Sequence, residues 1–136
     1  MAVLPENTSS IGSTGVTFVQ QPSNTWYINR TTLRIQGEID GLAAVQQAVD
    51  IILNVERFRW QIYKPYSGVQ WQGLIGRDPG YVGSELQRRI TDALLMDDRV
   101  QGVSDFTCEV RGNVLTASMT VNTVYGDVPA TAEVTL

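Results

Sequence analysis

Histidine is absent from the 136 residues, and cysteine occurs once, at Cys108. Without histidine the chain lacks the commonest general base and the commonest metal ligand. One cysteine excludes an intramolecular disulfide, and with no histidine beside it a zinc site of the usual kind is excluded as well. We therefore expect no metal and no cofactor. Cys108 lies in an alternating apolar stretch and is predicted to be a small buried residue.

Positive charge is also scarce and scattered. Ten lysines and arginines face fourteen aspartates and glutamates, and Lys64 is the single lysine, so the formal net charge is -4 and the pI is near 4.6. Proteins that bind nucleic acid rely on clustered basic residues to neutralise phosphates. The composition therefore predicts no nucleic-acid partner.

Long apolar runs are missing too. No stretch approaches the roughly 20 residues that a membrane span requires, so we expect no membrane association. Residues 1–15 are rich in serine, threonine and glycine and have neither the basic start nor the apolar centre of a secretory signal. We expect residues 1–15 to form a flexible arm and residues 16–136 to form one domain that works in the cytoplasm, or in something assembled there.

The periodicity predicts two helices among short strands. Apolar residues recur at helical spacing over residues 40–54, with Asp40 as N-cap, and over residues 82–96, where Arg88, Arg89 and Asp92 fall on the solvent side. Alternation or β-branched content predicts strands at 16–19, 26–28, 32–35, 55–63, 100–110, 114–124 and 128–136. The fold class is therefore α+β, a single domain with a mostly antiparallel sheet and two main helices.

Several strings along this framework occur in a characteristic order. They are IDGLAAVQQA (39–48), ILNVERF (52–58), LIGRD (74–78), DDRV (97–100) and VNTVYG (121–126). The ordered set resembles the PBSX-like branch of the baseplate wedge family of contractile tails. That family includes the T-even sheath-initiator wedge protein and the matching type VI secretion baseplate component. The resemblance covers roughly residues 25–136.

The resemblance implies a structural protein and not an enzyme. Such a protein docks on the helical core bundle of the other baseplate wedge proteins, exchanges strands with the tail sheath protein to template its first ring, and is present in several copies in a symmetric baseplate. The implied location is the tail baseplate of a virion or a tail-like bacteriocin particle, assembled in the host cytoplasm. The family docks through an acidic–basic pair after the first helix, here Glu56 and Arg57. Members often carry glycine or proline around the pair, whereas this chain has Val55 and Phe58.

The residues themselves leave an alternative open at each candidate site. Arg57 could instead bond the carbonyls at the end of the first helix. Trp60 and Tyr63, with Tyr66 and Trp71, suit a docking surface, but they also suit closure of the core or stacking on carbohydrate. The last strand has little edge protection, which favours strand exchange, although an ordinary edge or internal strand fits equally. Its residues are Thr131, Ala132, Glu133, Val134, Thr135 and Leu136.

The sequence leaves two rival functions open. A glycoside hydrolase needs two carboxylates, one of them with a raised pKa, and the candidates are Glu38, Asp40, Glu56, Asp78 and Glu85. No two of them stand out as a pair, and Arg57 beside Glu56 would oppose a raised pKa there. Clearing of a peptidoglycan suspension by the protein would favour this rival. The second rival is a general adaptor domain outside contractile tails, which the gene neighbourhood would distinguish.

Overall fold

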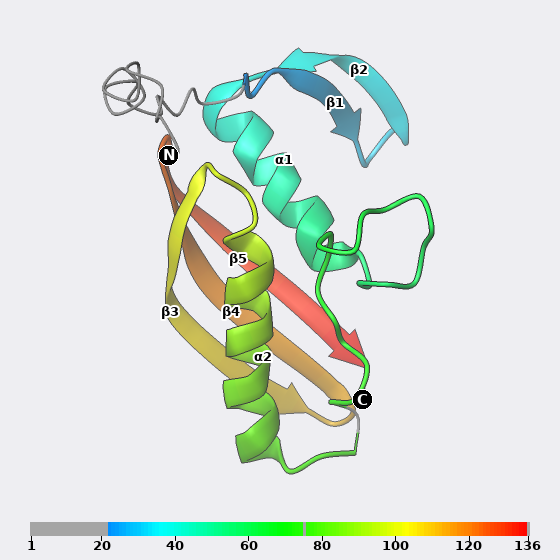
Figure 1. Ribbon diagram of the computed structural model, residues 1–136, viewed down its shortest axis with the longest axis vertical. Helices are drawn as coiled ribbons and strands as arrows, with labels where there is room; N and C mark the ends of the chain where they lie inside the picture. Colours follow the sequence, from blue (N-terminus) through cyan, green and yellow to red (C-terminus); the bar gives the residue numbers. More distant parts are fainter. Residues whose placement is uncertain (1–21, 75, 136) are drawn as a thin grey trace, which may run out of the picture.

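The computed structural model describes residues 22–74 and 76–135, and it has an α+β fold (Figure 1). In chain order the elements are β1 (Thr25–Asn29), β2 (Arg34–Ile39), α1 (Gly41–Asn54), α2 (Pro79–Leu94), β3 (Val100–Arg111), β4 (Val114–Thr123) and β5 (Gly126–Thr135). The predicted arm at 1–15, the predicted strand at 16–19 and Leu136 lie outside the described residues.

The strands form two antiparallel sheets. β1 and β2 make a hairpin, while β3, β4 and β5 make a three-stranded sheet with β4 in the middle. Both helices cover one face of the three-stranded sheet, and the β1–β2 hairpin projects beside the start of α1, away from that sheet (Figure 1). The predicted α+β class with a mostly antiparallel sheet is confirmed.

The core lies between the two helices and the inner face of the sheet. Residues four apart on α2, such as Leu86, Ile90 and Leu94, are fully buried because that spacing places them on one side of the helix. Alternate residues of β4 face the helices and are buried, while those between them lie on the other face of the sheet. The buried set on β4 is Leu115, Ala117, Met119, Val121 and Thr123.

The helix boundaries follow the chemistry at their first residues. Asp40 accepts a hydrogen bond from the Gly41 amide, which confirms it as the N-cap of α1. The second helix begins at Pro79, three residues before the predicted start at Val82. Proline suits the first helical position because its fixed φ matches the helix and its missing N–H would have no partner there.

The predicted strand at 55–63 is wrong. Residues 57–68 form an irregular loop, and Glu56 alone makes an isolated bridge, to Val69. Phe58 has φ +67°, which an extended strand does not allow, and it is 70% exposed. Ile62 is 86% exposed, so the alternation of large apolar residues here does not mark a buried face.

The predicted strand at 32–35 is displaced. Residues 30–33 form a turn in which the Asn29 side-chain oxygen accepts hydrogen bonds from the Thr31 and Thr32 amides, and β2 begins only at Arg34.

The side-chain amide of Gln47 on α1 pairs with the open side of β1: it accepts from Ile28 N and donates to Trp26 O, both at 2.9 Å. The hairpin is thereby fixed to α1.

Candidate docking corner and sheet edge

The chain that leaves α1 is tied back on itself at once. Val69 N donates to Val55 O and Arg57 N donates to Val69 O, both at 3.0 Å. These two bonds bring the ends of the irregular segment together, so residues 57–68 form a loop with closed ends. We call it the corner loop. Gly68 sits at its end with φ +83°, and a Cβ there would collide with the Val55 carbonyl oxygen. The close approach of the two chain segments therefore requires glycine at position 68.

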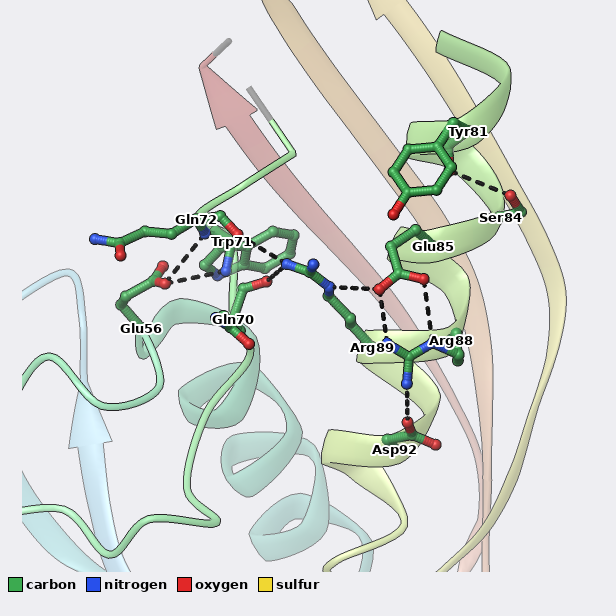
Figure 2. A network of polar contacts seen from close by, with 10 residues as sticks. All are labelled: Glu56, Gln70, Trp71, Gln72, Tyr81, Ser84, Glu85, Arg88, Arg89 and Asp92. Carbon is green, nitrogen blue, oxygen red and sulfur yellow. Dashed lines mark hydrogen bonds and ion pairs between the residues drawn. The ribbon is translucent and has the colours of Figure 1, made fainter. Parts of the chain in front are cut away.

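Glu56 directly precedes the corner loop and is half-buried. Its Oε1 accepts hydrogen bonds from Trp71 N at 3.1 Å and from Gln72 N at 3.3 Å (Figure 2). Main-chain donors to a carboxylate form charge-assisted bonds, which are stronger than neutral ones. The Glu56 carboxylate thus fixes the segment that returns toward α2.

Arg57 holds the end of the same loop. Its Nε donates to Gly68 O at 3.0 Å and its Nη2 to Tyr66 O at 3.4 Å. The carbonyls that it binds belong to the loop and not to the end of α1. Within residues 22–74 and 76–135 no ion pair joins Glu56 to Arg57, in agreement with adjacent residues pointing to opposite sides.

Arg89 on α2 meets the return segment from the other side. Its Nη1 donates to Gln70 O at 2.9 Å and to Gln72 O at 2.8 Å, while its Nε donates to Glu85 at 2.9 Å (Figure 2). The prediction that Arg89 faces solvent is therefore wrong, and its side chain is only 18% exposed. Residues 70–72 are held between Glu56, which accepts from their amides, and Arg89, which donates to their carbonyls. We call this arrangement the clamp.

Glu85 orients the clamp arginine. It accepts from Arg88 at 2.6 Å and from Arg89 at 2.9 Å, and Arg88 also bonds Asp92 at 3.0 Å (Figure 2). Hydrogen bonds from Arg88 and then from Arg89, with the positive charge of both, lower the pKa of Glu85 to about 2. The spacing of Glu85 and Arg89, four residues apart on a helix, was visible in the sequence, but the loop carbonyls that Arg89 binds were not.

The aromatic residues near the corner divide into two groups. Trp71 packs against the core, whereas Trp60, Tyr63 and Tyr66 are exposed on the corner loop. Tyr63 and Tyr66 also line a shallow groove of about 240 Å³ between the loop and the ends of both helices. Its other lining residues include Ile51, Ile52, Val55, Ala93 and Met96. The structure thus assigns core closure to one tryptophan and leaves the other aromatic side chains at the surface.

The last strand runs along one edge of the three-stranded sheet. Thr131 to Thr135 pair with β4, with Ala132 opposite Ala117 and Val134 opposite Leu115. Ala132 is buried and Val134 half-buried on the helix side, while Thr131, Glu133 and Thr135 are exposed on the other face. Among the described residues no further strand pairs with β5.

The register shows which amides of β5 point away from β4. Pro129 lies opposite Thr120 in an uninterrupted antiparallel ladder, and proline is tolerated in a sheet where its nitrogen faces outward. Residues two apart share the same orientation in such a ladder. The amides of Thr131, Glu133 and Thr135 therefore point toward the open edge, and Pro129 interrupts that row only near its beginning.

The opposite edge of the sheet, formed by β3, is less regular. Its pairing with β4 shifts between Val100 and Gly102 and again between Ser104 and Thr107, and Asp105 has φ +53°. Bulges of this kind twist an edge and obstruct pairing with another chain. Cys108 on this strand is partly buried against the core, and burial raises the pKa of its thiol. Of the two edges, β5 is the one with a regular row of outward amides.

The carboxylates considered for hydrolysis have structural partners in several cases. Asp40 caps α1, Glu56 belongs to the clamp, and the lowered pKa of Glu85 is the opposite of what a general acid requires. No cluster of three potential metal-ligating side chains occurs in residues 22–74 and 76–135. Neither helix of this part of the chain has the length and apolar character needed to cross a bilayer.

Two comparisons with known proteins point to one family. Residues 20–126 match the family described as contractile injection system sheath initiator. The chain is also 35% identical over 112 residues to the phage-like element PBSX protein XkdS of Bacillus subtilis (strain 168). The alignment covers 79% of each chain. The matched region spans β1 to the start of β5 and includes the corner loop and the clamp. The chain belongs to the sheath-initiator family of contractile injection systems, whose role is structural.

Proposed function

We propose that this chain starts sheath assembly by accepting a strand of the tail sheath protein along the open edge of β5, while its corner docks on the helical core bundle of the baseplate wedge proteins. The observation that carries the first part is the row of outward amides at Thr131, Glu133 and Thr135 on a strand without a bulge. A strand added there would gain main-chain hydrogen bonds without disturbing the core.

The docking part of the proposal involves Glu56, Arg57, Trp60 and Tyr63. The exposed rings of Trp60 and Tyr63 are anchors of the kind that dominate protein interfaces. Arg57 takes part chiefly by fixing the loop, since its side chain bonds the Tyr66 and Gly68 carbonyls, and Glu56 takes part by fixing residues 71 and 72 just after the loop. Several copies would act around a symmetric tail baseplate, in a phage or in a tail-like bacteriocin particle assembled in the host cytoplasm.

Replacing Glu133 by proline tests the strand-exchange part. The change removes an outward amide and keeps the bonds to β4, as Pro129 already does, so the domain should lose no more than about 1 kcal/mol of stability. Tails assembled with this variant should have baseplates without sheath in electron micrographs. Glu133→Ala keeps the amide and should support normal sheath. Normal sheath with a folded Glu133→Pro protein would reject the edge as the acceptor. Deleting residues 131–136 is a poorer test, because buried Ala132 is lost with them.

The docking part has its own test. Trp60→Ala and Tyr63→Ala remove exposed rings whose side chains make no hydrogen bond within the described part of the chain, so both variants should fold normally. Each should reduce incorporation into baseplates, measured by quantitative blotting of purified particles. Leu33→Ala removes a still more exposed apolar side chain, in the β1–β2 turn, and should leave incorporation unchanged. Equal incorporation of all three variants would place the docking surface elsewhere.

A further inference from the structure

Positive charge is concentrated in one stretch of this acidic protein. Between Glu56 and Asp78 there is no acidic residue, yet this stretch contains Arg57, Arg59, Lys64 and Arg77. The chain as a whole carries a net charge of -4. A local surplus of one sign on a protein of the other sign directs association with a partner of complementary charge.

Most of the other cations are already paired. Five of the six arginines outside this stretch form ion pairs, and Arg34 is the exception in the described part of the chain; the five are Arg30, Arg88, Arg89, Arg99 and Arg111. In the described part of the chain Arg59 and Lys64 form none. Arg59 instead lies over the ring of Trp60 at 5.2 Å, and Lys64 lies over the ring of Tyr66 at 5.7 Å. Stacking on a ring leaves their charge available to an anionic group from outside.

Apolar surface accompanies these charges. Phe58 and Ile62 are exposed on the corner loop, and the groove between the loop and the helices is lined mainly by apolar side chains. Asp97, which borders this groove, is paired with Arg99 at 2.7 Å, so its charge is already balanced. The volume of about 240 Å³ suits one or two apolar side chains and is too small for a folded domain.

We infer that the corner binds an acidic amphipathic helix of the partner protein, with apolar side chains in the groove and carboxylates against Arg59 and Lys64. This rests on the proposed docking function and names the chemistry of its partner. An amphipathic helix presents apolar and acidic residues on separate faces, so one helix can offer apolar side chains to the groove and carboxylates to the two loop cations. The main-chain bonds that close the corner loop and the bonds from Arg57 to the Tyr66 and Gly68 carbonyls fix the loop before binding, which reduces the ordering entropy that association must overcome.

Nucleic acid and anionic membranes carry the same sign of charge but fit less well. Phosphate binding gains most from many clustered cations, whereas the corner offers Arg59 and Lys64 on a protein with a net charge of -4. The groove is apolar and is bounded by a loop with a fixed conformation. It therefore fits a row of apolar side chains better than it fits a lipid surface. Both alternatives are arms of the test.

Binding of a designed peptide tests the inference directly. The probe is a labelled helical peptide of about five turns with leucine on one face and glutamate on the other, measured by fluorescence anisotropy with the full chain. The comparison probes are its leucine–lysine counterpart, a short single-stranded oligonucleotide, and vesicles of equal parts phosphatidylglycerol and phosphatidylcholine. We expect the leucine–glutamate peptide alone to bind, with affinity falling as salt is raised from about 0.05 to 0.5 M.

The charge variants complete the test. Arg59→Gln with Lys64→Gln should weaken peptide binding by about tenfold, whereas Arg34→Gln with Arg111→Gln, which removes equal charge elsewhere, should change it less than about twofold. No binding of the acidic peptide, equal binding of the basic peptide, preference for the oligonucleotide or vesicles, or no effect of the first double variant would each overturn the inference. If Trp60→Ala still impairs baseplate incorporation in such a case, the docking function stands and only the acidic partner is rejected.

Discussion

Replacing Glu56 by alanine separates a folding role of this residue from a docking role. The change deletes the oxygen that accepts from Trp71 N and Gln72 N. A hydrogen bond to a charged group contributes about 1.5–3 kcal/mol. The Gln72 bond is long and its residue is exposed, so water replaces much of it. We therefore expect a loss of about 2 kcal/mol in the free energy of unfolding, which comes mainly from the Trp71 amide.

The expected loss corresponds to a fall in Tm of about 6–8 °C for a chain of this size, measured by circular dichroism. Glu56→Gln keeps one uncharged acceptor and should lose about half as much. Glu133→Gln, at an exposed site, should stay within about 0.5 kcal/mol of the parent and controls for the loss of one negative charge. If Glu56→Ala lost less than about 0.5 kcal/mol, the clamp would not stabilise the fold and Glu56 would be free for a direct contact with a partner.

Two further predictions concern the same region. Gly68→Ala should destabilise the protein by about 3 kcal/mol or more in urea titration, because the new Cβ meets the Val55 carbonyl. Gly73→Ala has nearly the same positive φ but open space around it, and it should lose only about 1–2 kcal/mol. Equal losses in the two variants would refute the steric explanation. The pKa of Glu85 lies at about 2 in the folded protein, below its ordinary value of 4.5, so its contribution to stability is present above pH 4.5 and is lost as the pH falls toward 2. Glu85→Gln should therefore lose less stability between pH 5 and pH 2 than the parent does, and an unchanged acid slope of the urea midpoint would contradict this.

The helices and the C-terminal strands were predictable because local spacing and burial agree there. In α2 the apolar residues at intervals of four all meet one core, and in β4 strict alternation separates the helix side from the open face. The start of α2 lies three residues before the predicted one, because the prediction followed the apolar spacing from Val82 whereas the helix begins at Pro79.

The corner was less predictable because its order comes from contacts distant in sequence. The alternation of Phe58, Trp60 and Ile62 is typical of a strand. Gly68 and the main-chain bonds of Val69 nevertheless close this part of the chain into a loop. The clamp joins Glu56 to residues 15 and 16 positions later, and Arg89 to residues 17 and 19 positions earlier. No local pattern specifies such pairs.

A cryo-electron microscopy map of the sheath–baseplate junction with this chain in place would show whether the open edge of β5 accepts a strand. We expect a strand of the sheath protein beside β5, with main-chain hydrogen bonds to Thr131, Glu133 and Thr135. A map in which sheath contacts this chain elsewhere and leaves the β5 edge without an added strand would contradict it.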